Sequence, residues 1–219
     1  MKKVFDLMTV LCLAFSIFIS CSNADELIKE TSEFTEVENS IIKMKELFES
    51  KNFKTIDDAA LYAKELVQDI KPITRAINED DYIAKISPCA LLVIEKMKNI
   101  EVNTNNSPED YRTNLKQIIE DSELSKESVE YKYLLKSVDI TIEVIYYAME
   151  IEASTAVSRG FWATAWSAIK CIGGTAGSAG LGILGGAGVG TVTLPIIGTI
   201  SGTALGGWSG ALVGVATFC

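Results

Sequence analysis

Residues 160–219 read GFWATAWSAIKCIGGTAGSAGLGILGGAGVGTVTLPIIGTISGTALGGWSGALVGVATFC. This segment holds all 16 glycines of the chain, and no residue after Lys170 is charged. Many of the glycines recur every four residues, which places them on one face of a helix. A glycine face lets two helix backbones approach closely, which favours helix association in lipid. The glycines that we expect to associate helices are Gly182, Gly186, Gly190, Gly198, Gly202, Gly206, Gly210 and Gly214.

In water, so many glycines would weaken a helix, because each costs about 1 kcal/mol relative to alanine. We therefore expect the segment to enter a membrane or to associate with itself. Two alternatives remain open: a flexible linker, and a glycine zipper packed on the rest of the protein or in an oligomer.

The uncharged tail is long enough for two helices that cross a bilayer. Residues 171–192 and 196–219 would form helices of about 33 and 36 Å, against a hydrocarbon core of about 30 Å. Pro195 lies in the connection between them, so we predict a helical hairpin with this proline at its tip. An antiparallel hairpin would bring Cys171 and Cys219 to the same end, where a disulfide is geometrically feasible.

A short aromatic segment, residues 159–170, precedes the hairpin. Tryptophan and basic residues beside an apolar span are typical of a membrane interface. The residues predicted to lie at that interface are Phe161, Trp162, Trp166 and Lys170.

We predict that residues 1–21 are a targeting signal. Residues 1–21 read MKKVFDLMTVLCLAFSIFISC, with two lysines followed by an apolar stretch that is short for a spanning helix. The last four residues resemble the lipobox of bacterial lipoproteins. That resemblance implies cleavage before Cys21 and lipidation of its sulfur and new amino group. It places the protein in the bacterial cell envelope, anchored by lipid in the outer membrane or at the cell surface. An ordinary secretory signal and an uncleaved anchor remain the alternatives.

Residues 22–158 form an acidic segment with helical periodicity. Of the 29 acidic residues, 28 lie here with 16 of the 20 basic ones, giving a net charge of −12. Apolar residues repeat at spacings of three and four, and no strand pattern of any length competes. The fold class predicted for the whole chain is all-α: an acidic helical bundle followed by a glycine-zipper hairpin, residues 171–219.

The composition excludes several functions. The whole chain carries a net charge of −9, so we expect no nucleic-acid partner. It has no histidine, which removes the common nucleophile–histidine pairs and histidine-ligated zinc sites. No nucleophile has a base beside it in the sequence. We therefore predict no catalytic residues, no metal, no cofactor and no enzymatic activity.

The tail resembles pore-forming peptide bacteriocins, which are glycine-rich peptides with GxxxG helices and tryptophans near one end. The layout is similar to halocin-like precursors, in which an acidic N-terminal part shields a C-terminal peptide. That resemblance implies a hairpin that inserts and oligomerises in a bilayer through its glycine faces, with Arg159–Gly160 as the point of release.

Two other functions stay open from the sequence. One is a non-toxic structural envelope lipoprotein that is anchored at both ends. The other is a helical module that binds a protein partner.

Overall fold

A computed structural model describes residues 32–74, 86–103, 106–155 and 170–219. The fold is all-α, as predicted, apart from one two-stranded sheet within the described ranges. The elements in chain order are α2 (Ser32–Ser50), α3 (Ile56–Thr74), α5 (Pro88–Lys98), α6 (Pro108–Glu120), α7 (Val129–Thr155), α9 (Ile172–Ala187), β1 (Thr191–Leu194), β2 (Gly198–Ser201) and α10 (Gly202–Phe218).

Local capping chemistry fixes where α6 begins. The Ser107 Oγ accepts a hydrogen bond from the backbone N–H of Asp110, and the Asp110 carboxylate accepts one from the N–H of Ser107 at 2.7 Å. Pro108 occupies the first helical position, where its missing N–H has no cost. At α5, the Ser87 Oγ accepts a hydrogen bond from the N–H of Ala90 and Pro88 follows, but the N–H of Ser87 donates to the Glu130 carboxylate of α7.

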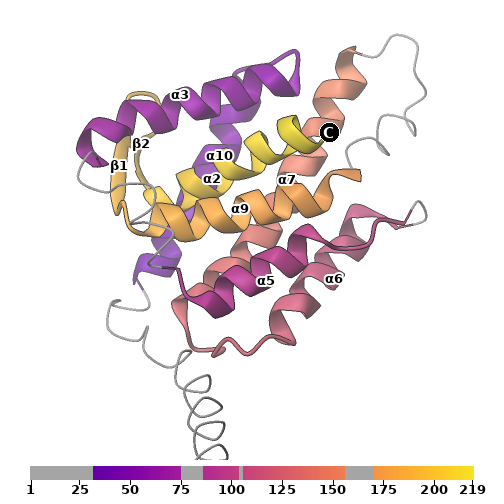
Figure 1. The fold of residues 1–219 in the computed structure, drawn as a ribbon. Helices are drawn as coiled ribbons and strands as arrows, with labels where there is room; N and C mark the ends of the chain where they lie inside the picture. Colours follow the sequence, from indigo (N-terminus) through magenta and orange to yellow (C-terminus); the bar gives the residue numbers. More distant parts are fainter. Residues whose placement is uncertain (1–31, 75–85, 104–105, 156–169) are drawn as a thin grey trace, which may run out of the picture.

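The tail lies inside the bundle. Figure 1 shows α9 and α10 side by side, with α3 on one side of the pair and α5 on the other. Helices α2 and α3 contact α10, α5 contacts α9, and α7 contacts both. The buried side chains form one continuous core that runs from Val37 on α2 to Val215 on α10. The zipper therefore shares its core with the acidic helices, which was one of the alternatives left open by the sequence.

The helices of the tail are shorter than predicted. Helix α9 has 16 residues and α10 has 17, so they are about 24 and 26 Å long. The residues between them form the antiparallel pair β1–β2, with Val192 opposite Ile200 and Leu194 opposite Gly198. The prediction that a helix starts at Ile196 is therefore wrong. The β-branched residues on either side of Pro195 favour strands, and they pair before α10 begins.

Candidate functional site

The candidate site is the hairpin of residues 171–219, here called the zipper hairpin, which consists of α9, β1, β2 and α10. Its two helices touch through glycine. A Cβ built on Gly182 would collide with the carbonyl oxygen of Gly206, and a Cβ on Gly206 would collide with that of Gly182. Gly186 and Gly202 oppose each other in the same way. These glycine faces therefore pair with each other within one chain.

The next turn extends the same contact toward the C-terminus. A Cβ on Gly210 would strike the carbonyl oxygen of Ser178, and one on Gly214 would lie 2.9 Å from the Cα of Thr175. In each case the Cβ would meet backbone atoms, or the short side chain of Ser178, which cannot adopt another rotamer that makes room. Only glycine fits at these positions because the two backbones themselves are in contact.

Gly190 and Gly198 have a different role from the one predicted. Both have positive φ angles, +74° and +73°, and a Cβ at either would meet nothing within 4 Å. They lie outside the two helices and allow the chain to adopt left-handed backbone at the two ends of the β1–β2 hairpin. The prediction that Gly190 and Gly198 lie on a helix-association face is therefore wrong.

The zipper hairpin is closed at both ends. At its base, Cys171 and Cys219 form a disulfide with Cα atoms 5.2 Å apart. At the other end, the β1–β2 ladder is followed by a hydrogen bond of 2.6 Å from the N–H of Gly202 to the carbonyl of Gly190. The two arms of the hairpin are therefore joined covalently at one end and by backbone hydrogen bonds at the other.

A second set of glycines contacts those surrounding helices, and these glycines were not among the residues predicted from the sequence. A Cβ on Gly173 would lie 2.5 Å from the Lys98 carbonyl oxygen of α5, and one on Gly207 would lie 2.8 Å from the side chain of Ile140. Gly180 packs against side chains of α5 and α7. The sequence signal was present, because Gly173 and Gly177 are also four residues apart.

We call the covering helices α2, α3, α5 and α7 the sheath. Packed against the sheath and against each other, α9 has 11 of its 16 residues buried and α10 has 11 of its 17. A strip of small residues along the α9–α10 seam remains partly exposed, and it includes Ser178, Gly182, Gly206 and Gly210. Neither helix carries a charged residue. A helix without a polar face is typical of a buried core or of a membrane segment.

One aromatic contact anchors the hairpin to the sheath. The ring of Trp208 on α10 is stacked on that of Phe48 on α2, with centroids 5.9 Å apart and planes 7° apart. Phe48 also contacts Phe53 and Tyr62. Trp208 is only 1% exposed, so it reports directly on whether the hairpin is inside the bundle.

Two ion pairs join α2 to α7. The Lys45 ammonium lies 2.6 Å from a carboxylate oxygen of Glu143, and that of Lys136 lies 2.5 Å from Glu38. The hydrogen bond to Glu143 raises the pKa of Lys45 above its ordinary value. We call these two pairs the sheath latches. Both are substantially exposed to solvent, so each contributes at most about 1 kcal/mol.

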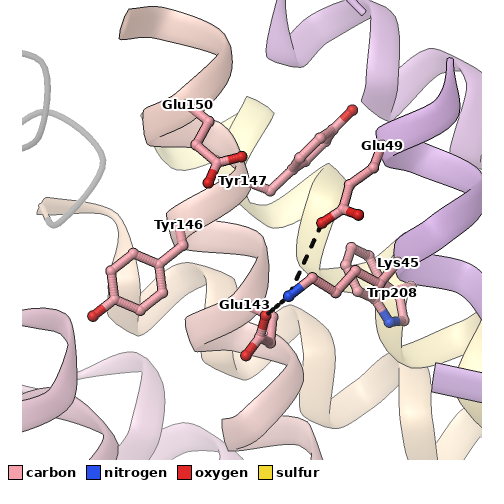
Figure 2. A pocket seen from close by; sticks show the side chains of 7 residues that line it. All are labelled: Lys45, Glu49, Glu143, Tyr146, Tyr147, Glu150 and Trp208. Carbon is pink, nitrogen blue, oxygen red and sulfur yellow. Dashed lines mark hydrogen bonds and ion pairs between the residues drawn. The ribbon is translucent and has the colours of Figure 1, made fainter. Parts of the chain in front are cut away.

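A small cavity lies beside the first latch. Figure 2 shows its lining, which comes from α2, α7 and α10, and its volume is about 30 Å³. The lining residues are Lys45, Glu49, Glu143, Tyr146, Tyr147, Glu150 and Trp208. That volume suits a single water molecule, so the cavity is too small for an organic substrate.

Within the cavity wall, Tyr147 is buried and donates a hydrogen bond of 3.0 Å from its hydroxyl to the carbonyl oxygen of Phe48. Burial raises the pKa of Tyr147 to about 12, with a further contribution from the negative charges of Glu49 and Glu150. The tyrosine is therefore a neutral hydrogen-bond donor at physiological pH and ties α7 to α2.

Three polar side-chain atoms of the described residues are buried without a hydrogen-bond partner, and all three are on the zipper hairpin. They are Thr175 Oγ1, Trp208 Nε1 and Ser209 Oγ. A buried donor or acceptor without a partner costs about 1–3 kcal/mol. These three atoms therefore offset part of the free energy that the hairpin gains by burying its apolar side chains in the bundle.

The remaining predicted residues divide into two groups. Lys170 is described and lies exposed just before α9. Cys21, Arg159, Gly160, Phe161, Trp162 and Trp166 lie outside the described residues. Within the described ranges, no cluster of three acidic or sulfur ligands has the geometry of a metal site.

In the described part of the chain, no helix combines the length and the apolar character that crossing a membrane requires. Comparison of the chain with protein families, with curated proteins and with solved structures finds no significant match.

Proposed function

We propose that the protein is an exported lipoprotein, anchored through Cys21, whose zipper hairpin leaves the sheath and inserts into a bilayer. One observation carries this proposal: the uncharged hairpin is closed on itself at both ends, yet it is covered by separate helices. Because α9 and α10 keep their mutual contact through Gly182 and Gly206, the pair can move as a unit. Lipid would then replace the apolar contacts that the sheath now supplies.

The hairpin would associate with its copies through other faces than those predicted from the sequence. The faces that contain Gly182 and Gly206 already pair within one chain. The second glycine set, with Gly173 and Gly180 on α9 and Gly207 on α10, would become free when α5 and α7 separate from the hairpin. We propose that oligomers form through these outer faces, because small residues favour helix contacts in lipid.

The lengths of α9 and α10 bear on how the hairpin would sit in lipid. Helices of about 24 and 26 Å are shorter than a hydrocarbon core of about 30 Å. Local thinning of the bilayer accommodates a mismatch of this size at modest cost. That thinning would itself favour permeabilisation of the target membrane.

A structural envelope lipoprotein remains the second candidate. The observation that favours it is the continuous core shared by the sheath and the hairpin. In that case the zipper is the permanent interior of a folded domain, and the bundle never opens.

Trp208 separates the two candidates. In the chain from residue 22 with Trp162→Phe and Trp166→Phe, Trp208 is the remaining tryptophan of the three. Vesicles of phosphatidylethanolamine and phosphatidylglycerol are loaded with dye and contain lipids brominated on their acyl chains. Insertion predicts quenching of Trp208 together with dye release. Unquenched Trp208 in this variant, together with no dye release by the variant or by the parent chain that keeps Trp162 and Trp166, would rule out insertion and leave the envelope protein.

A further inference from the structure

The end of the zipper hairpin that carries Pro195 exposes apolar side chains. Ile196 is 61% exposed, the largest exposed fraction of any large hydrophobic side chain among the described residues. Pro195 is also exposed, and Ile197 is half-buried. We call residues 194–198 the tip. Figure 1 shows β1 and β2, which the tip joins, at the opposite end of the hairpin from the C-terminus.

Part of the backbone next to the tip is hydrogen-bonded within the hairpin. Four residue pairs form the β1–β2 ladder, from Thr191 opposite Ser201 to Leu194 opposite Gly198. The N–H of Ser201 is also bonded, because it donates to the Ser40 Oγ at 2.9 Å. A segment can enter hydrocarbon only when its backbone polar groups have partners. The β1–β2 ladder pairs one edge of each strand, so it supplies part of those partners.

The protein as a whole has a net charge of −9, but the tip itself is uncharged and has a lysine beside it. Residues 171–219 contain no charged side chain. Lys43 of α2 contacts β2, because its ammonium donates a hydrogen bond of 3.1 Å to the carbonyl of Thr199. The Lys43 side chain is exposed. A lysine beside an exposed isoleucine combines attraction to anionic headgroups with an apolar group that can enter the acyl boundary.

The two ends of the hairpin differ in whether a charged side chain would have to leave water when that end enters lipid. The base carries the disulfide and is preceded by the exposed Lys170. The tip carries Ile196 and no charge of its own. The tip is therefore the end that can enter lipid without moving a charge out of water.

We infer that the tip is the surface through which the protein docks on an anionic lipid bilayer, and that the hairpin enters the bilayer tip first. This inference rests on the proposed function. Ile196 enters the acyl boundary, Lys43 binds the headgroup region, and the sheath separates only after this contact.

The test compares matched single substitutions in the chain from residue 22. Ile196→Asp places a charge at the tip, whereas Leu92→Asp makes a similar change on α5, where Leu92 is 58% exposed. Both positions are exposed, so the fold should survive, which circular dichroism checks. Binding is measured by co-sedimentation with vesicles of phosphatidylethanolamine and phosphatidylglycerol at 3:1. We expect Ile196→Asp to weaken binding about tenfold or more and Leu92→Asp to change it less than twofold.

Ile196→Trp is the positive counterpart, because tryptophan favours the interface, and it should bind at least as tightly as the parent chain. Equal effects of the two aspartate variants would overturn the inference. A loss of self-association on light scattering, with vesicle binding unchanged in Ile196→Asp, would overturn it in favour of a second copy of the chain.

The outcomes also separate this inference from the proposed function. Tip-dependent binding without quenching of Trp208 would support docking and contradict insertion. In the chain with Trp162→Phe and Trp166→Phe, Trp208 could be quenched equally with and without Ile196→Asp. That result would support insertion and overturn docking through the tip. Absence of any binding by the parent chain would overturn both.

Discussion

Gly182 and Gly206 face each other so closely that a Cβ on either would collide with the carbonyl oxygen of the other. The two residues lie on α9 and α10 of the same chain, so the glycine zipper is an intramolecular contact. The hairpin and the sheath share one core. A bulky residue at Gly206 would therefore disturb the whole domain, and loss of membrane activity in Gly206→Leu or Gly210→Leu would not by itself identify a membrane role.

We expect Gly182→Ala to destabilise the protein by about 1–3 kcal/mol. The added methyl group forces α9 and α10 apart, which outweighs the gain in helix propensity of about 1 kcal/mol. The matched control is Gly188→Ala at the end of α9, where the residue is exposed with φ of −74°. This control should be neutral or stabilising by up to about 1 kcal/mol. Urea unfolding followed by circular dichroism measures both, and similar effects at the two sites would contradict the packing described here.

The disulfide at the base of the hairpin should contribute substantially to stability. Cys171 and Cys219 are separated by 48 residues, and the chain-entropy relation for a loop of this size gives about 4 kcal/mol. We expect the double variant Cys171→Ser/Cys219→Ser to lose much of that free energy of unfolding. The single variant Cys219→Ser should lose as much, because either change breaks the same bond. A double variant as stable as the parent would show that the bond does not constrain the unfolded chain.

Alkaline unfolding should depend on Tyr147. Its pKa is raised to about 12 by burial, against an ordinary value of 10.0, so the folded state favours the neutral phenol. The contribution of this residue to stability is then complete below pH 10 and is lost as the pH rises from 10 to 12. Tyr147→Phe should cost about 1 kcal/mol at pH 7, through the lost hydrogen bond to Phe48, and should flatten the alkaline decline. Urea unfolding at a series of pH values measures both effects. An unchanged alkaline decline in the variant would show that other groups cause it.

The sheath latches should affect opening more than stability. Lys45→Met with Lys136→Met removes both ion pairs between α2 and α7. Because these pairs are exposed, we expect a loss of less than about 2 kcal/mol in the free energy of unfolding. Under the proposed function, the same variant should release vesicle dye faster.

The matched control is Lys54→Met with Lys64→Met, which removes two exposed lysines and the same charge. Equal dye release by the two double variants would indicate that net charge, rather than the latches, controls opening.

The sequence alone determined the helical class, the spacing of four that puts the helical glycines on one face, and the hairpin direction that allows Cys171 to meet Cys219. These features follow from local periodicity, because residues four apart share a helix face wherever the helix lies. The caps of α5 and α6 are equally local, since a serine followed by proline specifies a helix start without help from the rest of the fold.

Only the tertiary structure decided what the glycine faces contact. A glycine face can pair with a lipid-embedded copy, with an oligomer partner or with another helix of its own chain, and the spacing is the same in all three cases. The choice depends on contacts between distant parts of the chain, such as Phe48 on Trp208 and Ser40 on Ser201, which is 161 residues away. Gly190 and Gly198 lie outside the helices because β1 pairs with β2. This cross-strand pairing cannot be seen from a spacing of four residues.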